Sequence, residues 1–223
     1  MTGTTFQGRR AASIENDRLR VTVLAEGGHI AEILHKATGV NPLWVPPWPS
    51  IEPSAFHPGP ANPYGEGVEA KLLSGIMGHN LCLDLFGGPS PEEAAAGLGV
   101  HGESSVNPYR IEAAEGGLLM DVTLPLAGLR FERRLALDGE TVRIREAVEN
   151  TSATDRPIAW TQHVTLGPPF LAGGATRFLA SATRSKTFEG VFGAHDYLSP
   201  AAEFEWPMAP RAGGGMVDMR VYS

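Results

Sequence analysis

Apolar and polar residues alternate along much of the chain, and this alternation predicts β-strands. Leu19, Val21 and Val23 are separated by polar residues. Further along, the apolar residues at every second position from 118 to 126 share one face. A period of two places apolar side chains on one side of a strand and polar side chains on the other.

One pair of alternating segments predicts a β-hairpin. The segments 129–137 and 140–148 are separated by Asp138-Gly139. An Asp-Gly pair tolerates positive φ at both central positions of a tight turn, so we expect the turn at these two residues.

Glycine and proline set the expected fold class. The chain contains 27 Gly and 18 Pro, which are scattered without a period. This usage favours many short strands joined by turns. A convincing helical pattern occurs only over 91–96, where two glutamates lie in the first turn. The proline-rich segment 41–63 is expected to be an ordered loop. We therefore predict an all-β protein, a large antiparallel β-sandwich formed as a single domain over residues 1–223.

Composition excludes several classes of protein. The 223 residues include 18 Lys+Arg and 25 Asp+Glu, giving a net charge of −7, which argues against a nucleic-acid partner. No apolar run is long enough to predict a membrane-spanning helix. The polar start of the chain lacks the apolar region of a secretory signal, so a cytoplasmic location is expected. Cys82 is the one cysteine; it excludes a disulfide framework and is interpreted as a packed core thiol.

Histidines are the natural candidates for acid–base chemistry, because imidazole titrates near neutral pH. His163 lies in a predicted strand, where Trp160 and Val164 share one face and His163 projects from the opposite, polar face. His101 is flanked by glycines, which allow close approach of a ligand. The alternative to a catalytic role is an exposed strand histidine for His163 and an incidental histidine in a glycine-rich turn for His101. Trp160 itself is expected to pack in the core. The full set of histidines is His29, His35, His57, His79, His101, His163 and His195.

Two further chemistries, a metal site and a dinucleotide site, are suggested by residues of the same segments. A zinc or iron site built from His79, Asp84, His101 and His163 is chemically reasonable, but these residues have no compact ligand spacing, and we expect no metal. The glycines around His101 also form a G-x-G-x-x-G sequence. It does not follow a predicted strand, and Pro108 opposes a following helix, so a dinucleotide site is rejected.

Three stretches together resemble the aldose 1-epimerase (galactose mutarotase-like) superfamily. Residues 14–44 are similar to its opening strands, and GLGVHG (97–102) is similar to its Leu-His-Gly segment. WTQHVTLGPPFL (160–171) is similar to its second histidine strand. The segment HNLCLDLFGG (79–88) is nearer to divergent branches of the superfamily.

This resemblance implies a β-supersandwich that binds a pyranose and interconverts its anomers by acid/base ring opening, with no cofactor. It implies that His163 is the general acid toward the ring oxygen and that His101 positions and polarises the sugar. In the family, the general base is a glutamate from strands that would lie beyond residue 223. The base is therefore unassigned, and the sandwich is expected to be truncated. The residues expected to contact the sugar are Asn80, Asp84, Glu103, Gln162 and Phe170.

Two other functions remain open at this point. Standard members of the family carry an arginine before the Leu-His-Gly segment, where this chain has Asn80 and Asp84. The absence of this arginine and of the family's glutamate favours a non-catalytic carbohydrate-binding protein on the same fold. A metal-dependent enzyme of cupin type is the third alternative. The expected partner is a small-molecule sugar, with neither nucleic acid nor membrane. An unfinished sheet edge would also favour pairing with a second copy, giving a homodimer.

Overall fold

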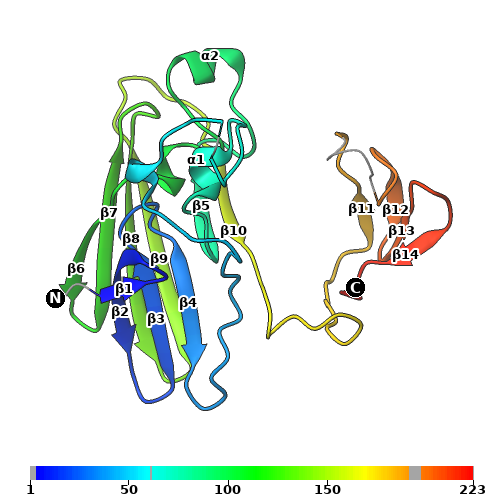
Figure 1. The fold of residues 1–223 in the computed structure, drawn as a ribbon, viewed down its shortest axis with the longest axis horizontal. Coiled ribbons are helices and arrows are strands. Elements are labelled where there is room, and N and C mark those ends of the chain that lie inside the picture. Colours follow the sequence, from blue (N-terminus) through cyan, green and yellow to red (C-terminus); the bar gives the residue numbers. More distant parts are fainter. Residues whose placement is uncertain (1–3, 61, 191–196, 223) are drawn as a thin grey trace. The chain divides into compact units, whose positions relative to one another are not determined.

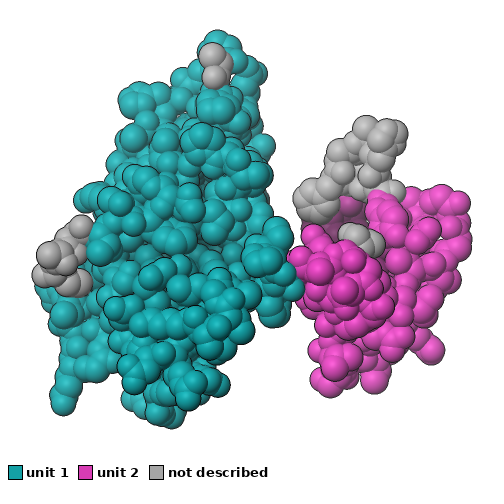
Figure 2. Space-filling view, turned by 60° about the horizontal axis from the view of Figure 1, so that its bottom comes forward, with its two compact units in different colours: residues 1–170 teal, residues 171–223 magenta. Residues whose placement is uncertain are grey.

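The computed structural model describes residues 4–60, 62–190 and 197–222. By compactness the chain divides into two units, Met1–Phe170 and Leu171–Ser223, shown in different colours in Figure 2. Each unit is described by itself below.

The first unit contains two antiparallel sheets, which lie one behind the other as layers in Figure 1. The first sheet has six strands in the order β1-β2-β3-β4-β5-β10 and the second has four in the order β6-β7-β8-β9. The strands of the first sheet are β1 (Thr4–Phe6), β2 (Arg9–Glu15), β3 (Leu19–Leu24), β4 (Ile30–His35), β5 (His79–Leu83) and β10 (Trp160–Val164). Those of the second are β6 (Arg110–Ala114), β7 (Gly117–Leu124), β8 (Leu129–Asp138) and β9 (Thr141–Asn150).

An apolar cluster joins the two sheets. Val21 and Leu81 of the six-stranded sheet are buried in one cluster with Met120 and Phe131 of the four-stranded sheet. The strands contribute alternate residues to this cluster, as the period-two pattern predicts. The prediction of an all-β, antiparallel sandwich is therefore confirmed.

The hairpin predicted near Asp138 is present, but its turn lies one residue later than expected. Asp138 is still paired, opposite Thr141, so Gly139 and Glu140 are the turn residues. Of these two, only Gly139 has a positive φ, of 56°. A glycine with positive φ at the first central position is typical of a type II′ turn, which continues the right-handed twist of the two strands.

The predicted helix over 91–96 is confirmed as α2 (Pro91–Ala95). It begins with a capping box: the Glu93 amide donates to the Ser90 hydroxyl at 3.2 Å, and the Ser90 amide donates to the Glu93 carboxylate at 2.7 Å. The other helices are α1 (Ala70–Leu73) and the 3₁₀ turns η1 (Pro53–Ala55) and η2 (Glu103–Ser105). Within the described ranges, no helix has the length and apolar character needed to cross a bilayer.

Over its described residues, 41–60 and 62–63, the proline-rich segment is a loop that includes the turn η1 and is held by hydrogen bonds and an ion pair. Near its start, the Trp44 amide donates to the Thr165 carbonyl at 2.8 Å, just after β10. Further on, Glu52 pairs with the fully buried guanidinium of Arg9 at 3.3 Å. Arg9 also donates to the Glu26 carbonyl at 2.7 Å, so a buried charge on β2 holds this loop in place.

The second unit contains two pairs of short antiparallel strands. β11 (Arg184–Lys186) pairs with β12 (Glu203–Glu205), and β13 (Met208–Pro210) pairs with β14 (Met216–Asp218). Thr187 and Ala209 are its only buried residues in the described ranges 171–190 and 197–222. His195 lies outside the described residues. The groups considered for chemistry below all belong to the first unit.

Candidate functional site

The site begins with the pairing of β5 and β10. In this antiparallel register, His163 lies opposite Asn80 and Thr161 lies opposite Cys82. Residues opposite each other in a sheet share a face, so these four side chains form one patch. Leu81 alternates with them and enters the core. The patch therefore lies on the side of the six-stranded sheet that faces away from the four-stranded sheet.

Beside this patch, part of the β5 backbone forms hydrogen bonds with serine hydroxyls instead of with a neighbouring strand. The Ser104 hydroxyl donates to the Leu81 carbonyl at 2.6 Å and accepts from the Leu83 amide at 3.1 Å. Ser105 donates to the same Leu81 carbonyl at 2.7 Å. Both serines belong to η2. These bonds hold the segment that immediately follows His101 against β5.

His101 is fixed by a reciprocal pair of hydrogen bonds with Gly87. The His101 amide donates to the Gly87 carbonyl at 3.0 Å, and the Gly87 amide donates to His101 Nδ1 at 3.0 Å. His101 has a φ of 66°, a left-handed conformation that histidine adopts more readily than most residues. Because Nδ1 accepts a hydrogen bond, the neutral ring carries its proton on Nε2.

The structure brings His101 and His163 together, although 62 residues separate them in sequence. Their ring centroids are 5.2 Å apart, with the planes at 78°. Phe86 stacks on His101 at 5.0 Å and meets the edge of His163 at 6.0 Å. We call His101 and His163 the histidine pair. Phe86 is 58% exposed, so the pair lies beside an aromatic surface that a ligand can reach.

Burial favours the neutral form of both imidazoles. Desolvation lowers the pKa of His163 below its usual value, and it is also the main cause that lowers the pKa of His101. Repulsion from His163 lowers the pKa of His101 further. A neutral imidazole offers one donor and one acceptor. His163 Nδ1 is buried and has no hydrogen-bond partner among the described residues.

Cys82 lies beside the histidine pair. One ligand atom from each of Cys82, His101 and His163 can be chosen so that all three lie within 4.8 Å of one another. The thiol is buried, as the sequence predicts, and burial raises its pKa to about 11. It is therefore protonated at neutral pH. The Asn80 side-chain amide donates to its sulfur at 3.7 Å.

The residues expected to contact a sugar occupy different environments. Asn80 is fully buried next to Cys82 and donates to the Ser105 hydroxyl at 3.2 Å. Asp84 pairs with Arg156. The buried carboxylate of Glu103 accepts from the Ala127 amide at 2.9 Å and so holds a turn of the second sheet. These contacts give both carboxylates structural partners.

Gln162 and Phe170 are not brought to the histidine pair. Gln162 follows the strand alternation and points to the opposite face, where it contacts His79 Nε2 at 2.6 Å and donates to Glu146. Phe170 is 49% exposed, and its ring contacts neither histidine of the pair. His79 also belongs to the Gln162 face and is thereby separated from His101 and His163.

Three residues of the site were not anticipated from the sequence. Cys82 was interpreted as a core thiol, although strand alternation with the apolar Leu81 and Leu83 could have placed it on the same face as Asn80. Phe86 looks buried in the sequence but is largely exposed. No sequence signal marks the Gly87 amide as the hydrogen-bond donor to His101.

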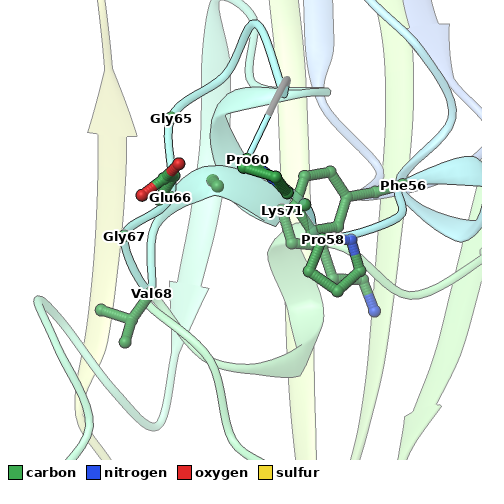
Figure 3. A pocket seen from close by; sticks show the side chains of 10 residues that line it. Phe56, Pro58, Pro60, Gly65, Glu66, Gly67, Val68 and Lys71 are labelled. Carbon is green, nitrogen blue, oxygen red and sulfur yellow. The ribbon is translucent and has the colours of Figure 1, made fainter.

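A separate hollow of about 330 Å³ lies over the loop that leads into α1. Figure 3 shows the side chains of Phe56, Pro58 and Lys71 gathered around it, with Val68 on the other side. Neither histidine of the pair lines this hollow. It offers an apolar surface without acid–base groups other than Lys71 and Glu66, so the chemistry remains with the histidine pair.

Comparison with known proteins gives the following results. No protein-family model matches the chain, and no curated protein matches it. One solved structure, a galactose mutarotase-like protein from Lactobacillus casei ATCC 334, aligns over 93% of this chain and 63% of its own, with a TM-score of 0.49 and 10% identity. A 4-alpha-glucanotransferase from Thermococcus litoralis aligns over 96% of this chain and 34% of its own, with a TM-score of 0.43 and 16% identity. The chain thus spans less than two thirds of either protein.

Proposed function

We propose that this protein is a carbohydrate isomerase of the aldose 1-epimerase type, which opens and closes a pyranose ring at the histidine pair. The observation that carries the proposal is the approach of the two imidazoles, with ring centroids 5.2 Å apart beside the exposed ring of Phe86. Anomer exchange needs only proton transfer at two oxygens of one sugar, and two adjacent imidazoles suit such a reaction.

In this proposal the two histidines have different roles. His101 holds its proton on Nε2 because Nδ1 accepts from Gly87, so it donates a hydrogen bond that orients the sugar. His163, when protonated, gives its proton to the ring oxygen as the bond from that oxygen to C1 breaks. The anomeric hydroxyl loses its proton to a base, which we do not assign. Rotation about the C1–C2 bond and reversal of the steps give the other anomer, and both protons return.

The lowered pKa of His163 gives the sign of the pH dependence. The acid form of His163 is the imidazolium, and desolvation lowers its pKa, so only a minor fraction is protonated at pH 7. We expect the anomer exchange rate to rise as the pH falls toward the pKa of His163, until the unassigned base is protonated.

The test is the rate of anomer exchange, followed by NMR or polarimetry across a panel of aldoses. We expect the wild-type protein to exceed the buffer rate, and His163→Ala to lower the enzymatic rate by about 10²–10⁴-fold. His57→Gln, which changes an exposed histidine outside the pair, is the control and should match the wild type. Equal rates for the wild-type protein, His163→Ala and buffer would remove the catalytic proposal.

A second function is a carbohydrate-binding protein without turnover. It is favoured by the carboxylates near the site, because Glu103 is bonded to Ala127 and Asp84 to Arg156, which leaves neither free to act as a base. Calorimetry distinguishes the two functions: saturable sugar binding with no exchange above buffer supports the binding protein. Absence of both binding and exchange for the whole panel would contradict both.

A further inference from the structure

We propose that Cys82, His101 and His163 form a binding site for a thiophilic divalent cation, of which Zn²⁺ is the representative. These residues can each direct one donor atom into a common space, with all three atoms within 4.8 Å of one another. Thiolate and imidazole are ligands that Zn²⁺ prefers, and three protein ligands leave a fourth position open for water or another ligand. From the sequence no metal is expected, because the candidate ligands His79, Asp84, His101 and His163 have no compact spacing, and Cys82 is not among those candidates.

The fold supplies this ligand set from three separate segments. Cys82 comes from β5 and His163 from the paired strand β10, on the same face of the sheet. His101 reaches them from the loop before η2. Coordination bonds of about 2.0–2.3 Å keep donor atoms within about 4.6 Å of one another, so a set within 4.8 Å needs at most a small adjustment. Two ligands on paired strands are rigidly placed, so most of this adjustment falls on the loop that carries His101.

Two unsatisfied polar atoms belong to residues that lie opposite each other on this face of the sheet. His163 Nδ1 and Asn80 Oδ1 are buried and have no hydrogen-bond partner among the described residues. Asn80 is fully buried, and its amide nitrogen donates to the Cys82 sulfur at 3.7 Å. Buried polar atoms without a partner indicate a bound water or ion. A hydrogen bond to the sulfur is also the kind of contact that supports a metal-bound thiolate.

Coordination has a defined proton balance. Cys82 must lose its thiol proton to solvent, and the positive ion replaces that proton as the partner of the buried sulfur. His101 must give up its hydrogen bond to Gly87 whichever nitrogen binds. If Nδ1 binds the ion, the lone pair is no longer available to the Gly87 amide. If Nε2 binds, its proton moves to Nδ1, which then cannot accept. Binding therefore weakens at lower pH and perturbs the Gly87 amide.

The cation also bears on the proposed function. An ion bound to His101 and His163 occupies the imidazole nitrogens that ring opening needs for hydrogen bonding and proton transfer. Zn²⁺ should therefore inhibit anomer exchange. This inhibitory effect rests on the proposed function, whereas metal binding itself does not.

The experiment is a titration of the full, reduced, metal-free chain with Zn²⁺ alone by calorimetry, and with Co²⁺ by absorption spectroscopy. We expect on the order of one Zn²⁺ per chain, a sulfur-to-cobalt charge-transfer band, and a shift of the Gly87 amide resonance on binding. Cys82→Ser should abolish the charge-transfer band and weaken Zn²⁺ binding by about 100-fold or more. Cys82→Ala and His163→Gln are parallel variants whose folding is checked by circular dichroism. His57→Gln is the matched histidine control and should bind as the wild type does.

The outcomes for Zn²⁺ binding and for anomer exchange can be told apart. A wild-type protein without the charge-transfer band, or folded Cys82 variants that bind Zn²⁺ as tightly as the wild type, would overturn the metal site. Loss of Zn²⁺ binding in a folded Cys82 variant, with the control unchanged, supports it. Anomer exchange is measured in the metal-free protein, so a failure there contradicts the proposed function and leaves the metal result standing.

Discussion

Arg133→Met is expected to lower the free energy of unfolding by about 3–5 kcal/mol, because it leaves a buried carboxylate without its counter-charge. The Arg133 side chain is fully buried on β8, and its guanidinium contacts Glu146 of β9 at 2.7 Å. It also donates to the Gly28 carbonyl at 2.8 Å and thereby links the two sheets. Glu146 is only 10% exposed, so water cannot replace the lost arginine.

A second variant tests whether the loss comes from the stranded charge. Arg133→Met combined with Glu146→Leu removes both ions, and we expect it to recover much of the stability lost in the single variant. The matched control is Arg134→Met, the next residue on the same strand. Its ion pair with Glu132 is exposed, so we expect a change below about 1 kcal/mol. Urea unfolding followed by circular dichroism measures all three. A double variant less stable than Arg133→Met would contradict this explanation.

The parts of the fold that the sequence predicted are those governed by local rules. The alternation of Leu19, Val21 and Val23 depends only on strand geometry, and these three residues are buried as expected. The capped helix α2 and the β8–β9 hairpin are likewise encoded within a few residues. The turn was displaced by one residue because the type II′ conformation needs positive φ only at Gly139.

Strand β10 shows where alternation alone is insufficient. It places Trp160 and Val164 on one face as predicted, but they are 44% and 49% exposed. β10 is the last strand of the six-stranded sheet, so apolar residues at this edge are covered from one side only. Trp160 contacts the core ring of Phe131 at 6.4 Å and remains open on its other side. The alternation of apolar and polar residues identifies the two faces of a strand, whereas the position of the strand in the sheet determines how far those faces are buried.

The candidate site depends on contacts between distant segments, which local patterns do not encode. Family resemblance singled out His101 and His163, and the structure places their rings together. The resemblance implied no role for Cys82, whose position relative to His163 follows from the β5–β10 register. Choosing that pairing from sequence requires knowing that Cys82 lies opposite Thr161, a contact between residues 79 positions apart. Gln162 lies on the opposite face from His163 for the related reason that a one-residue step along a strand reverses the face.

Acidification is expected to destabilise the protein through His29. This histidine is fully buried, and its Nε2–H donates to the Ser105 carbonyl at 3.0 Å. Burial, reinforced by the charge of Arg9, lowers the pKa of His29 to about 3. In the unfolded chain the pKa is about 6.5. Below that value the unfolded state takes up a proton that the folded state does not, so stability falls as the pH falls toward 3.

The size of this effect follows from the same two pKa values. Between about pH 7.5 and about pH 5, His29 should cost the folded state about 2 kcal/mol, in a range where most carboxylates stay ionised. His79, His101 and His163 also have lowered pKa values and act in the same direction, so the wild-type loss is larger.

His29→Gln isolates the contribution of His29. We expect it to be less stable than the wild type near pH 7.5 and to lose about 2 kcal/mol less on acidification. His57→Gln controls for loss of an exposed imidazole. Parallel stability curves for the wild type and His29→Gln would show that the buried imidazole is not the group that senses pH.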